Sequence, residues 1–87
     1  MRIVHGFLLR EVAGELIVIP TGEAARRLSG VITLNDCGRF LFERLQTEQT
    51  KDSLVKALTE EYDIDERTAS EDVAEFIDQL EQYGFLM

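Results

Sequence analysis

The chain has 87 residues, a net charge of −8 and 45% hydrophobic residues. A chain this short is expected to form one domain, residues 1–87, with a thin core and little room for a deep enclosed active site. No apolar run approaches the roughly 20 residues of a membrane-spanning helix, and the N-terminus lacks a secretory signal, so we expect a cytoplasmic protein. A single cysteine, Cys37, excludes an internal disulfide framework and a cysteine-rich zinc site.

The negative charge is concentrated in the second half of the chain. Residues 1–42 carry five arginines against four acids, whereas residues 43–87 carry thirteen acids against four bases. Such a field repels phosphate backbones, which disfavours nucleic acid as a partner and mildly favours a basic or neutral one. We favour the simpler interpretation of a solvated acidic surface that keeps a small protein soluble.

The first part of the chain has the patterns of β-strands. Phe7–Val12 and Glu15–Ile19 are apolar and β-branched, and Gly14 in the link between them can take a positive φ, which predicts a hairpin. Pro20 cannot donate to a strand ladder and marks the end of the second strand. A further β-branched run, Val31–Leu34, follows Gly30 and predicts a third strand.

The apolar spacing then changes from alternation to helical periodicity. Asn35, Thr50 and Asp65 are suitable N-caps for three successive helices. Gly84 is a suitable residue to follow the last helix, and Phe85 would then fold back on its final turn. Three strands followed by three helices indicate an α+β domain.

The side chains that carry chemistry form no catalytic or metal-binding pattern. His5 is the only histidine and has no second ligand or triad partner nearby in the sequence. Cys37 is expected in the first turn of a helix, where a small, partly buried hydrophobe is the favoured interpretation. Gly38 in the same helix suggests a close approach of the helix backbone to the sheet. We therefore expect no enzyme activity, no cofactor and no metal.

The strand Gly30–Leu34 is the sharper feature. This strand includes no charged residue and no proline among Val31, Ile32, Thr33 and Leu34. Proteins commonly place such residues on an exposed edge strand to prevent it from pairing with other chains. If this strand is an edge, an added peptide strand would satisfy its free backbone groups. The alternative is that the strand is central, or covered by a loop of the protein itself, and the residues alone leave both open.

The last helix has an aromatic border that could form the wall of a groove. Phe76 and Tyr83 extend its apolar stripe along one flank, next to Asp72. The opposite flank, with Ala74 and Glu81, is small or polar. Both aromatic residues can equally pack on the other helices, and which flank would face a peptide is not fixed by the spacing.

At this level the sequence resembles the coenzyme PQQ synthesis protein D family (PqqD-like), the peptide recognition elements of ribosomally synthesised, modified peptides. The matching segments are Ile19–Ala25, Gly30–Gly38, the helix ending at Leu45, Leu54–Leu58 with Glu61–Asp63, and Asp72–Val73 with Phe76, Leu80 and Gly84–Leu86. Family members commonly have Glu-Thr where this chain has Asp36-Cys37, and both pairs suit a helix start.

The resemblance implies a winged-helix-like fold and a non-catalytic role. It implies that the chain binds the leader of a precursor peptide and presents it to a modifying enzyme, commonly of the radical SAM type, in PQQ biosynthesis or a related pathway. The leader would add as an antiparallel strand to Gly30–Leu34, in a groove against the helix that carries Asp72, Phe76 and Tyr83.

Two other functions stay open from the sequence. A winged-helix DNA-binding regulator would need a basic recognition helix, whereas the last helix carries six acids against Arg67 alone. A structural subunit or homodimer could use the same strand edge on a second copy of the chain.

Overall fold

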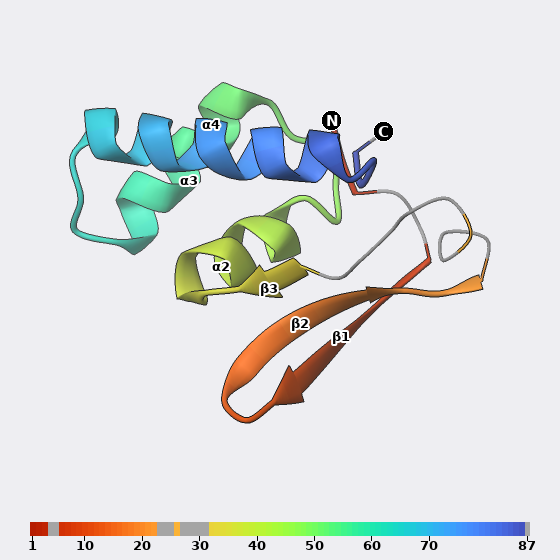
Figure 1. Cartoon of the computed structure of the whole chain (residues 1–87). Coiled ribbons are helices and arrows are strands. Elements are labelled where there is room, and N and C mark those ends of the chain that lie inside the picture. The colour runs from red at the N-terminus through yellow and green to blue at the C-terminus, as the bar shows by residue number, and fades with distance from the viewer. Residues whose placement is uncertain (4–5, 23–25, 27–31, 87) are drawn as a thin grey trace.

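The computed structural model describes residues 1–3, 6–22, 26 and 32–86, and within these ranges three strands precede three helices (Figure 1). The elements are β1 (Phe7–Val12), β2 (Glu15–Pro20), β3 (Ile32–Leu34), α2 (Asp36–Arg44), α3 (Lys51–Glu61) and α4 (Glu66–Gln82). The predicted α+β class, with three antiparallel strands before three helices, is confirmed. Among the residues described, no helix is long and apolar enough to cross a bilayer.

The predicted hairpin is formed by β1 and β2. They pair antiparallel from Phe7↔Pro20 to Val12↔Glu15, so β2 includes Pro20 as its last residue. The turn between them has two residues at positive φ, Ala13 at 52° and Gly14 at 83°. Two positive φ values match the right-handed twist of a hairpin, and this is the conformation for which the glycine is needed.

The sheet has the order β1–β2–β3, so β3 is an edge strand. Its register against β2 is Leu16↔Leu34, Ile17↔Thr33 and Val18↔Ile32. This excludes the alternative of a central third strand. The expected strand Gly30–Leu34 is described from Ile32 onward, and its first two residues lie outside the described ranges.

Each helix begins after one of the predicted caps. The side-chain oxygens of Asn35, Thr50 and Asp65 each accept a hydrogen bond from the amide three residues later, at 2.7, 3.0 and 2.7 Å. These bonds satisfy amides that lack a partner within the helix. At α3 the cap is reciprocal, because Ser53 Oγ also accepts from the Thr50 amide at 2.9 Å.

The reciprocal cap of α3 gives a first testable prediction. Replacing Thr50 by alanine removes an acceptor at the helix start and should lower the free energy of unfolding by about 1 kcal/mol. The melting temperature should fall by roughly 4–8 °C, measured by circular dichroism. Thr59→Ala, inside the same helix, is the matched control and should change the melting temperature little. An equal effect of both substitutions would contradict a specific role for the cap.

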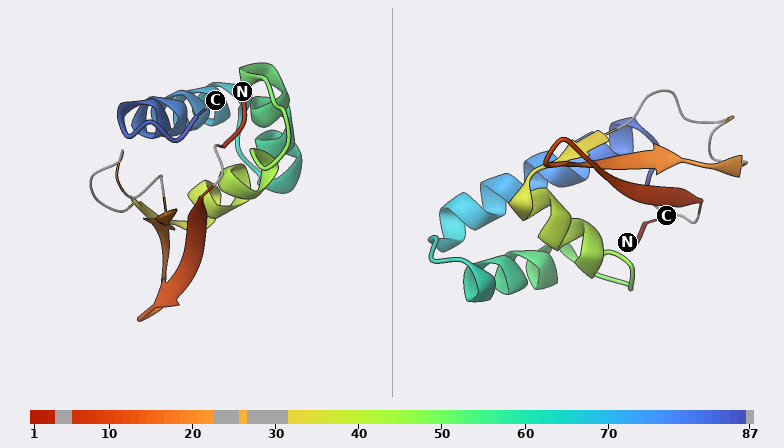
Figure 2. Two further views of the ribbon diagram at one scale, coloured as in Figure 1. Left: turned by 90° about the vertical axis from the view of Figure 1, so that its right-hand side faces the viewer. Right: turned by 90° about the horizontal axis from the view of Figure 1, so that it is seen from below.

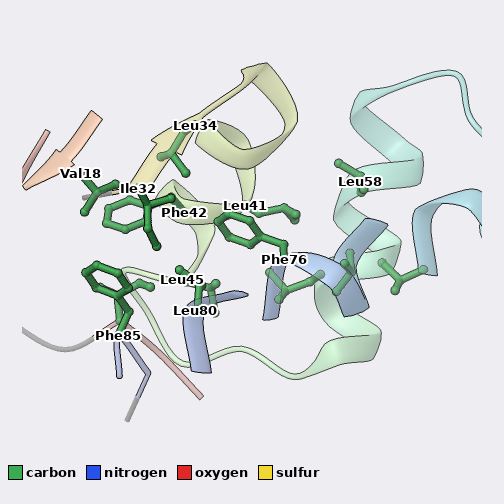
Figure 3. Packing of buried hydrophobic residues seen from close by; sticks show 14 of the residues in the cluster. Val18, Ile32, Leu34, Leu41, Phe42, Leu45, Leu58, Phe76, Leu80 and Phe85 are labelled. Atoms are coloured by element: carbon green, nitrogen blue, oxygen red, sulfur yellow. The ribbon is translucent and has the colours of Figure 1, made fainter. Parts of the chain in front are cut away.

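The apolar core lies between the sheet and the helices (Figure 3). Alternation along the strands turns Val18, Ile32 and Leu34 toward α2, and all three are buried. The hairpin beyond them extends away from α3 and α4 (Figure 2). Its opposite face is open, with Leu8 48% and Val12 51% exposed. Most of the hairpin is therefore outside the core.

The end of α4 is closed by a Schellman motif. Gly84 has φ 73°, its amide donates to the Glu81 carbonyl at 3.1 Å, and the Phe85 amide donates to the Leu80 carbonyl at 2.9 Å. Phe85 is fully buried, and its ring centroid lies 4.3 Å from that of Phe7. The predicted fold-back of Phe85 is confirmed, and it anchors the base of the hairpin.

The two ends of the chain also meet. Ile3 forms an antiparallel bridge with Leu86, and its amide donates to the Leu45 carbonyl at 2.8 Å. Both ends of the chain lie beside the end of α4 (Figure 1). Ile3 is 6% exposed, so this early segment is part of the core.

Candidate functional site

A groove of about 590 Å³ lies between β3 and α4. Its walls come from the hairpin turn, from β3 with the start of α2, and from one flank of α4. On the helix, the lining residues are Asp72, Glu75, Phe76 and Gln79, which follow the helical spacing of a single face. The groove therefore lies along the flank predicted from the aromatic border, and not along the flank of Ala74.

The floor of the groove is apolar and closely packed. Leu34 is 5% and Phe76 8% exposed, so each contributes to the core and also lines the groove. Gly38 lies between them, and a Cβ at this position would be 3.4 Å from Leu34 Cδ2 and 3.4 Å from Phe76 Cε1. The expected close approach at Gly38 is therefore confirmed: it is to the last residue of β3 and also to α4.

The backbone of β3 forms the other wall. One edge of the strand pairs with β2, and within residues 1–3, 6–22, 26 and 32–86 no backbone hydrogen bond reaches its outer edge. In an antiparallel ladder, alternate residues turn both their amide and carbonyl groups to one side. The outer edge of β3 thus presents donor and acceptor groups next to the groove.

Four of the predicted site residues meet in this groove. Thr33 and Leu34 contribute from β3, and Asp72 and Phe76 from α4. Thr33 and Asp72 are exposed, whereas the other two are mostly buried. The polar pair therefore lies at the surface of the groove and the apolar pair at its floor.

Two other predicted site residues, Ile32 and Tyr83, are described by the structure and do not line the groove. Ile32 is 2% exposed and points into the core, although its backbone belongs to β3. Tyr83 is 36% exposed, lies past the last lining residue of α4 and has its ring centroid 6.1 Å from that of Phe85. Gly30 and Val31 lie outside the described residues.

Several lining residues were not predicted from the sequence. Glu75 and Gln79 follow Asp72 by three and seven positions, so helical spacing could have found them. Gly14 is in the hairpin turn and Glu15 is the first residue of β2, and only the sheet register brings them next to Leu34. No local sequence signal indicates that the hairpin turn lies beside the groove.

Cys37 is half-buried and lines the groove close to α4. Burial raises the pKa of its thiol, and the negative charge of Asp72 raises that pKa further. This thiol is therefore the opposite of an activated nucleophile, in which a nearby cation or a helix terminus lowers the pKa. Among the described residues, no group of three or more His, Cys, Asp or Glu side chains is placed to hold a metal ion.

The family model of coenzyme PQQ synthesis protein D (PqqD) matches residues 9–86 of the chain. The chain belongs to the PqqD family. The resemblance inferred from its segments is thereby confirmed, and the match includes every strand and helix described here except the first two residues of β1.

A solved structure supports the fold of this PqqD family member. The structure is titled "TbiB1 in Complex with the TbiA(beta) Leader Peptide" and is similar with a TM-score of 0.75 and 19% sequence identity. The likeness covers 99% of this chain and 94% of the other. No curated protein sequence matches the chain.

Proposed function

We propose that this PqqD family member is a non-catalytic protein that binds the leader of a ribosomally made precursor peptide and presents it to a modifying enzyme. The observation that carries the proposal is the open edge of β3 beside the groove along α4. Family membership and the likeness to a protein solved with a leader peptide support the same function. The proposed receiving enzyme is of the radical SAM class, as the family resemblance implies.

Strand addition at this edge can supply enough free energy for micromolar binding of a peptide. Micromolar binding corresponds to about −8 kcal/mol. Backbone hydrogen bonds contribute roughly 0.5–1.5 kcal/mol net each, and apolar side chains of the peptide can contact the floor formed by Leu34 and Phe76. Backbone bonds carry no sequence information, so the groove side chains would select the leader.

The geometry of strand addition predicts an effect with a period of two residues. Each backbone amide of a leader is N-methylated in turn, using the leader of the precursor gene nearest to this chain's gene. Methylation at positions that pair with β3 should weaken binding about tenfold or more, because each removes a donor and adds bulk at the edge. Methylation at the alternate positions should have little effect. Affinity is measured by calorimetry.

The same leader gives a second readout on the protein. Amide resonances of Thr33 and Leu34 should shift on titration, while those of Arg67 and Glu71, on another face of α4, serve as the internal control. A leader that binds without shifts at β3, or with N-methyl effects that show no alternation, would rule out strand addition. Light scattering of the complex distinguishes peptide capture from pairing of two copies through this edge.

A further inference from the structure

The charge of the groove is one-sided. Four carboxylates line it: Glu15 at the start of β2, Asp36 at the start of α2, and Asp72 and Glu75 on α4. No lysine, arginine or histidine is among the described lining residues. Among the described lining residues, a strand added here would therefore meet negative charges and no positive one.

None of the ion pairs found between described residues neutralises these carboxylates. The pairs formed between two described residues are Arg39–Glu43, Arg67–Glu71 and that of the N-terminal amine with Glu48. None includes a lining carboxylate of the groove. The negative field of Asp72 reaches across the groove, since it contributes to the raised pKa of the Cys37 thiol.

The carboxylates also lie toward one end of the groove. Leu34 is level with Phe76, because both contact the position of a Cβ on Gly38. Cys37 follows Leu34 by three residues, and Asp72 precedes Phe76 by four residues. These two residues are also close to each other, because the charge of Asp72 acts on the Cys37 thiol. The chain from β3 into α2 therefore runs antiparallel to α4, and the acidic end lies beyond Leu34. The lining residue nearest the other end of α4 is the neutral Gln79.

We infer that the groove selects leaders that carry a lysine or arginine near the N-terminal end of the added strand. This inference rests on the proposed function. A peptide antiparallel to β3 begins at its Leu34 end, next to Asp36, Asp72 and Glu75. A cation there meets several carboxylates that the peptide itself partly shields from water, so the pairing is stronger than at an open surface. At the C-terminal end the same cation meets no carboxylate of α4.

The test uses the leader of the nearest precursor gene, after the N-methyl scan has located its paired residues. A lysine is introduced singly at the N-terminal and at the C-terminal end of the paired segment, each compared with glutamine at that position. Lysine at the N-terminal end should bind about threefold to fivefold more tightly than glutamine, and lysine at the C-terminal end about equally. The gain should shrink as salt rises from about 50 to 500 mM, because salt screens partly exposed charges.

Variants of α4 assign the effect to its carboxylates. The double variant Asp72→Asn/Glu75→Gln should lose most of the lysine preference, taken as the ratio of the lysine-peptide to the glutamine-peptide affinity measured on the same variant. The matched control is Asp78→Asn/Glu81→Gln, which removes two charges from other faces of the same helix and should keep the preference. This control shows whether net charge alone is responsible.

The outcomes separate the two proposals. Equal affinity for lysine and glutamine, with the alternating N-methyl pattern intact, overturns the charge inference and leaves strand addition standing. An equal loss of preference in both double variants also overturns it, because the effect would then come from net charge. Absence of binding with no shift at Thr33 overturns the proposed function and the charge inference together.

Discussion

Replacing Phe85 by alanine should destabilise the domain by about 3–5 kcal/mol, the usual cost of removing a fully buried phenylalanine. A chain of 87 residues has a total free energy of unfolding of roughly 4–13 kcal/mol, so this loss is a large fraction of it. The effect is large because Phe85 packs on Phe7 and thereby holds the hairpin on the helices. Urea unfolding followed by far-ultraviolet circular dichroism measures it.

The control lies next to Phe7 on the hairpin. Leu8 is 48% exposed on the opposite face of β1, so Leu8→Ala should shift the midpoint only slightly. In a double-mutant cycle, Phe7→Ala and Phe85→Ala should cost less together than the sum of the two, because they share one contact. Full additivity, or a Phe85→Ala protein as stable as the wild type, would refute the anchoring role.

Covalent modification of Cys37 should abolish leader binding. It is the only cysteine in the sequence and lines the groove beside Asp72, so a maleimide adduct would occupy the space proposed for the peptide. A saturating leader should in turn protect the thiol from modification. Both effects are measured by mass spectrometry and calorimetry. Cys37→Ala, treated with the same reagent, is the control and should bind the leader normally.

The pH dependence of this reaction follows from the raised pKa of the thiol. Thiolate is the reactive form, and burial with the charge of Asp72 disfavours it, so alkylation at pH 8 should be slower than for a free cysteine. The rate should rise with pH to above the ordinary thiol pKa. Asp72→Asn should speed the reaction at pH 8 by removing one of the two causes. A rate equal to that of a free cysteine, or no protection by the leader, would contradict this description of the groove.

Local chemistry made the elements of this fold predictable. The strand Phe7–Val12 was predicted with its observed bounds, and each helix begins after its predicted cap. These signals act within a few residues: alternation, β-branching, a turn glycine, and an acceptor three residues before an amide. The C-terminal cap at Gly84 is of the same kind.

The site was predictable only in part, because tertiary packing decides it. The sequence could not say whether the third strand is central or at an edge of the sheet, and the order β1–β2–β3 places it at an edge. Ile32 and Thr33 share a strand, yet alternation sends one into the core and the other to the groove. Tyr83 has the same helical phase as Phe76 but lies too far along α4 to line the groove.

The contact between the two ends of the chain has a consequence for biosynthesis. Phe7 near the N-terminus packs on Phe85, and Ile3 pairs with Leu86. Because a ribosome makes Phe7 well before Phe85, the hairpin gains its anchor only after Phe85 has been synthesised. Until then the Phe7 side chain, which packs on Phe85 in the folded domain, is open to contacts with other chains. The hairpin is therefore expected to pack on the helices only after the segment that carries Phe85 has left the ribosome.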